Sequence, residues 1–118
     1  MTKNEQLRER TKQFAIRVIH LFRALPNATD AQIMGKQLLR SGTSVGANYR
    51  AVCRSRSKAE FISRLAVVTE EADESVFWLE LIEETKVINP KLLEAILTEA
   101  RELVAIFSAS LKTARANK

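Results

Sequence analysis

Apolar residues recur every three or four positions along four stretches of the chain, which is the pattern of one face of an α-helix. In the first stretch, for example, Phe14, Val18 and Leu21 follow this spacing. The predicted helices cover residues 4–25, 30–54, 57–86 and 90–114. Because the connections between them are short, consecutive helices are expected to lie antiparallel. The pattern therefore predicts an all-α fold, an antiparallel up-down-up-down four-helix bundle in a single domain spanning residues 1–118.

Capping signals precede three of these stretches. A Ser or Thr followed three residues later by Glu or Gln forms a capping box at a helix start. An Asn followed by Pro supplies an N-cap and a first helical residue. The pairs are Thr29 with Gln32, Ser57 with Glu60, and Asn89 with Pro90. Each pair predicts that a helix begins there.

The middle of the second stretch, residues 41–48, consists largely of small residues, including Gly42 and Gly46. Each glycine costs a helix about 1 kcal/mol relative to alanine, so a loop is an alternative interpretation. The apolar spacing nevertheless continues through this segment to Tyr49 and Val52. We therefore expect a continuous helix whose small side chains let a neighbouring helix approach closely.

The composition fits this fold. Of the 118 residues, 46% are hydrophobic and 28% charged, with only three glycines and two prolines, which is too apolar for a disordered chain. A single cysteine, Cys53, excludes an intrachain disulfide and a cysteine-rich metal site. No apolar run has the length that a membrane helix needs, and the N-terminus is polar. We expect a cytoplasmic protein.

Four blocks of the sequence carry a family resemblance. They are QLLRSGTSVGAN (37–48), SKAEF (57–61), EEADES (70–75) and FWLEL (77–81). In this order they resemble the bacterial four helix bundle protein family, first noticed in intervening sequences of 23S ribosomal RNA genes. The resemblance implies a four-helix bundle that assembles into a ring-like homo-oligomer, pentameric in some members, with no catalytic activity assigned to the family. A related branch comprises accessory proteins of diversity-generating retroelements, which work with a reverse transcriptase and its RNA.

Charge is distributed unevenly along the chain. Residues 1–64 carry thirteen Lys/Arg and four Asp/Glu, a net charge of +9, whereas residues 65–118 carry six Lys/Arg and ten Asp/Glu, a net charge of −4. Basic side chains cluster in and after the second predicted helix, and we call this set the basic ridge: Lys36, Arg40, Arg50, Arg54, Arg56 and Lys58. Such a ridge matches the charge of a nucleic-acid backbone. The alternative is that these side chains, Arg40 above all, form ion pairs with the acidic residues at 70–84.

A second set of residues points to helix packing or contact between copies. The small polar residues favour close packing over ligand binding, and Asn48 is a candidate for fixing helix register. The carboxylates are candidates for ion pairs within a chain or between copies, and the tryptophan lies on or beside a core face. The set is Ser41, Ser44, Asn48, Glu71, Glu74 and Trp78.

The sequence offers no pattern typical of an enzyme, a metal site or a cofactor site. A di-iron bundle needs Glu-x-x-His pairs, but the single histidine, His20, has Arg17 three residues before it. The glutamate pairs at 70/74 and 80/84 have the spacing of cation ligands, but such pairs are common on solvated helices. No glycine-rich phosphate loop is present. We therefore predict no catalytic residues, no metal and no cofactor.

Two functions follow as hypotheses. The first is a non-enzymatic, homo-oligomeric scaffold in which the basic half of one copy meets the acidic half of the next. The second is an RNA-binding accessory protein, of a reverse transcriptase or of a ribosomal RNA intervening sequence, that uses the basic ridge. The two hypotheses divide on whether the ridge is exposed or consumed by ion pairs.

Overall fold

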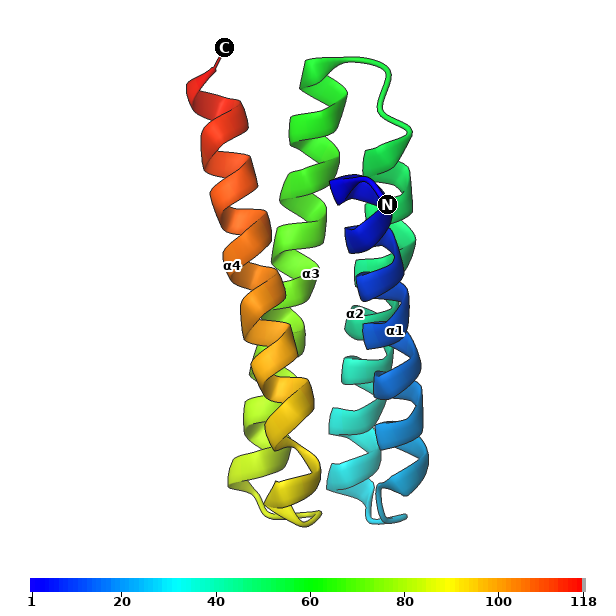
Figure 1. The fold of residues 1–118 in the computed structure, drawn as a ribbon. Helices are drawn as coiled ribbons and strands as arrows, with labels where there is room; N and C mark the ends of the chain where they lie inside the picture. Colours follow the sequence, from blue (N-terminus) through cyan, green and yellow to red (C-terminus); the bar gives the residue numbers. More distant parts are fainter. Residues whose placement is uncertain (118) are drawn as a thin grey trace.

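Four long helices make up most of residues 1–117, which the computed structural model describes. They are α1 (Lys3–Ala24), α2 (Thr29–Cys53), α3 (Lys58–Glu84) and α4 (Glu94–Ala116), with a short 3₁₀ helix, η1 (Pro90–Leu92), before α4. The chain reverses direction at each connection, so that α1 and α3 run opposite to α2 and α4 (Figure 1). The expected all-α four-helix bundle is confirmed.

The beginnings of α1 and α3 are set by hydroxyl side chains. Thr2 Oγ1 accepts a hydrogen bond from the backbone N–H of Glu5 at 3.1 Å. Ser57 Oγ accepts from the backbone N–H of Glu60, also at 3.1 Å, so the expected cap on α3 is present. The reciprocal half of that capping box differs, because the Glu60 carboxylate accepts from the backbone N–H of Arg56 instead of Ser57.

The other two capping predictions are wrong in detail. The first residue of α2 is Thr29, so its side chain lies inside the helix, and Ala28 occupies the cap position without a side-chain bond. Gln32 instead donates its side-chain N–H to the carbonyl of Pro26 at 2.9 Å. Asn89 does cap a helix, but that helix is η1, and α4 begins only at Glu94 because residues 90–92 take the tighter 3₁₀ turn.

The end of α3 is also earlier than expected. Lys86 has a φ angle of 57°, the left-handed conformation that commonly follows the last turn of a helix. Its backbone N–H donates to the carbonyl of Glu83 at 3.2 Å, which satisfies a group that the helix end leaves open. The helix therefore stops at Glu84, two residues before the predicted boundary.

The core lies along the axis of the bundle and receives side chains from all four helices. The apolar stripes read from the sequence point into it, and Phe14, Leu38, Leu79 and Phe107 are each at most 1% exposed. Helix α2 packs extensively against both α1 and α3, and α3 packs against α4, whereas α1 and α4 make much less contact. Helix α2 is thus the central element on one side of the bundle.

Residues 41–48 are helical, as expected, and the loop alternative is wrong. The physical reason is visible at its glycines, which face α1. A Cβ atom added at Gly42 would lie 2.7 Å from Val18 Cγ2, and one added at Gly46 would lie 3.2 Å from the carbonyl oxygen of Thr11. Close packing of α1 onto α2 therefore outweighs the helix cost of the two glycines.

Candidate polyanion-binding groove

A groove of about 700 Å³ runs between the first half of α1 and the second half of α2. Its floor is made of small residues, which leave space where larger side chains on both helices would meet. These residues are Ala15, Thr43, Gly46 and Ala47. The close approach of α1 to α2 thus leaves a channel on the outer surface of the two helices.

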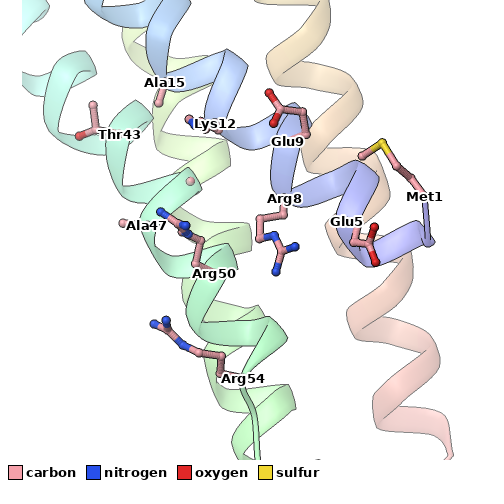
Figure 2. A pocket seen from close by; sticks show the side chains of 11 residues that line it. Met1, Glu5, Arg8, Glu9, Lys12, Ala15, Thr43, Ala47, Arg50 and Arg54 are labelled. Carbon is pink, nitrogen blue, oxygen red and sulfur yellow. The ribbon is translucent and has the colours of Figure 1, made fainter.

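Four cationic side chains surround this floor, and together with it they form what we call the basic groove. Arg8 and Lys12 come from α1, and Arg50 and Arg54 come from the last turn of α2 and its C-cap. In each pair the residues are four apart, so the charges repeat about every 6 Å along the helix. Figure 2 shows Arg50 and Arg54 extending from the same side of α2, with Arg8 between that helix and α1.

The cations of the basic groove are free of carboxylate partners. All four are exposed, and no carboxylate of residues 1–117 lies within 4.0 Å of any of them. Two acidic residues also line the groove, Glu5 and Glu9 on α1. The Glu9 carboxylate accepts a hydrogen bond from the side chain of Gln13 at 2.8 Å. With four cations and two carboxylates, the side chains that line the groove carry a net positive charge.

The six residues of the predicted basic ridge do not form one continuous surface. The structure places Arg50 and Arg54 in the basic groove, while Lys36 and Arg56 are exposed outside it. The remaining two, Arg40 and Lys58, have partners within the chain. The ammonium group of Lys58 donates to the backbone carbonyl of Asn117. Nucleic-acid binding by the whole ridge stays a prediction, and the basic groove has a different membership.

Arg40 belongs to an ion-pair network between α2 and α3. Its guanidinium lies 3.2 Å from a carboxylate oxygen of Glu71 and also bonds Glu74. Glu74 in turn accepts a hydrogen bond from Trp78 Nε1 at 3.0 Å. The hydrogen bond from Trp78 and the guanidinium of Arg40 together lower the pKa of Glu74. The alternative interpretation of Arg40 as an internal ion-pair residue agrees with this geometry.

Arg10 forms a similar network between α1 and α4. Its guanidinium lies 2.7 Å from carboxylate oxygens of both Glu99 and Glu102. The hydrogen bond to Glu99 is the main cause that raises the pKa of Arg10 above its ordinary value. Two of the basic residues in the first half of the chain are therefore neutralised by acidic residues of the second half.

The small polar residues of α2 differ in what they contact. Ser75 Oγ of α3 donates to Ser41 Oγ at 3.0 Å, a buried hydrogen bond between the two helices. Asn48 instead donates to the carbonyl of Ser44 in its own helix at 2.9 Å. Ser41 therefore links α2 to α3 within the chain, while the hydrogen bond of Asn48 joins no second helix. Sequence reasoning missed Ser75, which lies on the core face of α3.

Sequence reasoning also missed Arg8 and Lys12. From the sequence they are only charges that lie off the apolar face of the first helix. Their spacing of four residues, repeated by Arg50 and Arg54, was an available signal. What the sequence lacked was the rotation of the two helices that brings these pairs to the same channel.

Other chemical centres are sparse in the described part of the chain. Residues 1–117 contain no group of three or more His, Cys, Asp or Glu side chains placed to hold a metal ion. Cys53 is half-buried. Burial raises the pKa of nearby Tyr49 to about 12, and its ring stacks on Phe107 with centroids 5.5 Å apart. Among these residues no helix is both long enough and apolar enough to span a bilayer.

Comparison with known proteins places the chain in a family. Residues 3–109 match the family model described as 23S rRNA-intervening sequence protein. The chain belongs to that family. Among solved structures, it is similar to a protein of unknown function from the S23 ribosomal protein family of Bacteroides thetaiotaomicron. The two are 34% identical, the match covers 94% of this chain and 99% of the other, and the TM-score is 0.85. No functionally curated protein matches the sequence.

Proposed function

We propose that this protein is a non-enzymatic, cytoplasmic RNA-binding protein that holds phosphate groups in the basic groove. The observation that carries the proposal is the convergence of Arg8, Lys12, Arg50 and Arg54 on one channel without a carboxylate of residues 1–117 within ion-pair distance. Elsewhere, Arg10 and Arg40 each hold two carboxylates. Charge that is left unpaired at one site is available to a polyanion.

The chemistry of the groove favours contact with the backbone over contact with bases. Arginine guanidinium groups fork onto phosphate oxygens, and the lysine supplies a further positive charge. No aromatic residue of the described chain lines the channel to stack on a base. Binding of this kind depends on the release of counterions and so weakens as salt rises. Four phosphate contacts on a single strand correspond to a slope of about −3 in a plot of log K against log salt.

The experiment is a titration of fluorescently labelled RNA with nuclease-treated protein over a series of salt concentrations. The wild-type chain is compared with the double variant Arg50→Glu/Arg54→Glu by fluorescence anisotropy. We expect the double variant to lose at least about tenfold in affinity, since two attractive contacts become repulsive. We also expect the salt slope to fall to about half its wild-type value or less, because two of the four contacts are gone.

Arg23→Glu/Arg115→Glu is the matched control, because both arginines lie in the last turn of a helix, are exposed, and do not line the groove. This control corrects for the change in net charge and for the loss of a cation at a helix C-terminus. Equal loss of affinity in both variants would show that only net charge matters. Absence of RNA binding by the wild-type chain at low salt would refute the proposal itself.

A second candidate function, assembly into a homo-oligomeric scaffold, rests on exposed apolar side chains. Phe77 of α3 is 50% exposed and packs edge-to-face on Trp78, with centroids 5.0 Å apart. Val67 of α3 and Ile33 of α2 are also exposed. Large apolar residues of this kind are frequent at contacts between proteins. Because Glu74 already has a partner in its own chain, these apolar residues support the proposal better than the charge difference between the two halves.

Phe77→Glu tests this second candidate by placing a charge at an exposed apolar position of α3. If copies meet there, we expect the wild type to have the mass of a ring, five subunits by the family resemblance, and the variant to have the mass of smaller species. Light scattering after size-exclusion chromatography measures both masses. Thr98→Glu on α4, another exposed helical position, is the control. A monomeric wild type, or a variant with unchanged mass, would contradict assembly through this face.

A further inference from the structure

The basic groove lies along the line where α1 and α2 approach closely. Helix axes in such a pair are about 8–10 Å apart, and Gly42 and Gly46 leave no room for a side chain between these two helices. An RNA duplex is much broader than a single strand, since its two paired strands enclose a deep major groove and a wide, shallow minor groove. A duplex can therefore touch the tips of the arginines but cannot enter the channel. A single strand of sugar and phosphate is slim enough to do so.

The floor of the groove carries no charged side chain, so it is suited to contact with a sugar. Ala15 and Ala47 present methyl groups, and Gly46 presents only backbone. The hydroxyl of Thr43 already donates to the carbonyl of Leu39 at 2.6 Å, so it is occupied within α2. The cations Arg8, Lys12, Arg50 and Arg54 line the same groove. A strand lying in the channel would place its sugars on the small residues and its phosphates toward Arg50 and Arg54.

The residues around the groove also indicate that it does not recognise the bases of a bound strand. The two aromatic residues nearest in sequence to the groove-lining positions, Phe14 and Tyr49, are buried and do not line it. Phe77 is the exposed aromatic ring within residues 1–117, and it belongs to α3. Bases of a strand in the groove would therefore have no ring to stack on and would remain in solvent. Recognition would not depend on the base sequence.

We propose that the basic groove selects an unpaired strand of RNA over a duplex, because only a single sugar-phosphate strand reaches the small-residue floor between α1 and α2. This inference rests on the proposed function and adds the class of RNA. It also assigns a role to Ala47, which is exposed and lines the channel without carrying charge. A larger side chain there would occupy space that the strand needs while leaving every cation in place.

The test compares two probes and two variants at one low salt concentration. The probes are a labelled oligouridylate and the same oligouridylate annealed to oligoadenylate. The variants are Ala47→Leu, which fills the channel, and Ala105→Leu, a matched change at an exposed position of α4 outside the groove. Leucine is a good helix former, so both variants should fold, which circular dichroism checks. We expect the wild type to bind the single strand at least about fivefold more tightly than the duplex.

We expect Ala47→Leu to weaken binding of the single strand by about fivefold or more and to change binding of the duplex by less than about twofold. Ala105→Leu should change neither. Equal or tighter binding of the duplex, with no selective effect of Ala47→Leu, would overturn this inference but leave the proposed phosphate-binding function intact. If neither probe binds the wild type at low salt, the proposed function fails together with the inference.

Discussion

Arg40 and Arg50 lie on the same helix, ten residues apart, and their surroundings differ completely. Arg40 faces α3, where Glu71 and Glu74 neutralise it. Arg50 lines the basic groove, to which Arg8 and Lys12 of α1 also contribute. Arginine therefore has a different role on each of these two sides of α2. Toward α3 the charge joins two helices, and toward α1 the four cations of the groove outnumber its two carboxylates. The helix that packs beside each arginine decides whether its charge is paired within the chain or available to a binding partner. The residue type does not decide this.

The largest expected effect concerns the close contact that shapes the groove. Gly46→Leu should lower the free energy of unfolding by about 1–3 kcal/mol, because its side chain meets the backbone of Thr11, which cannot move without shifting α1. Urea denaturation followed by circular dichroism measures this change. Ala47→Leu, one residue later but exposed, is the control and should change stability by less than about 0.5 kcal/mol. Equal stabilities of the two variants would contradict the close contact between α1 and α2.

An intermediate effect comes from neutralising one arginine on each side of α2. Arg40→Gln should lower the free energy of unfolding by about 0.5–1 kcal/mol, because it leaves the carboxylates of Glu71 and Glu74 facing each other. Arg50→Gln should change stability by less than about 0.5 kcal/mol, since it removes a charge that has no partner. Affinity for single-stranded RNA should show the reverse order. Arg40→Gln leaves it unchanged, and Arg50→Gln reduces it. If the same variant showed the larger loss both in stability and in RNA affinity, the two sides of α2 would not differ in role.

The smallest expected effect is on the pH dependence of stability. The pKa of Glu74 is lowered by its hydrogen bond from Trp78 and by Arg40. A lowered pKa in the folded state gives stability that is present above the ordinary pKa of the carboxyl group and is lost as pH falls through the folded value. Between about pH 6 and about pH 3, the wild type should therefore lose a few tenths of a kcal/mol more than Glu74→Gln.

The fluorescence of Trp78, the single tryptophan, reports the unfolding transition in this experiment. Glu70→Gln provides a control at an exposed position on the same helix. If Glu74→Gln and the wild type lose the same stability in acid, the hydrogen bond from Trp78 to the carboxylate makes no contribution to the free energy of unfolding. The comparison of the two sides of α2 would then rest on Glu71 alone.

Much of the fold could be predicted because helix formation depends on neighbours within a few residues. The spacing of apolar residues located all four helices, and Ser57 marked the start of α3. The errors lie at helix ends, where the backbone conformation differs from the one that the capping patterns predict. Thr29 entered the helix one residue early, Asn89 capped a 3₁₀ turn, and Lys86 adopted a left-handed conformation that is more usual for glycine.

The candidate site could be predicted only in part. The sequence pattern identifies Arg50 and Arg54 as a basic pair but groups them with Arg40, because all three lie near one stripe of the same helix. The structure separates them, since a rotation of about 80° around a helix is enough to move a side chain from one neighbouring helix to the other. Arg8 and Lys12 complete the groove from a different helix. Their spacing matches that of Arg50 and Arg54, but spacing along the chain does not reveal that the two pairs line the same groove.

The sequence by itself determined which segments are helical, which face of each is apolar, and that the first half of the chain carries excess positive charge. These properties follow from local geometry and from counting side chains. Only the tertiary structure decided which positive charges are neutralised and which converge on a channel. The reason is that electrostatic interaction depends on distance in space, and the rotation and register of packed helices set that distance.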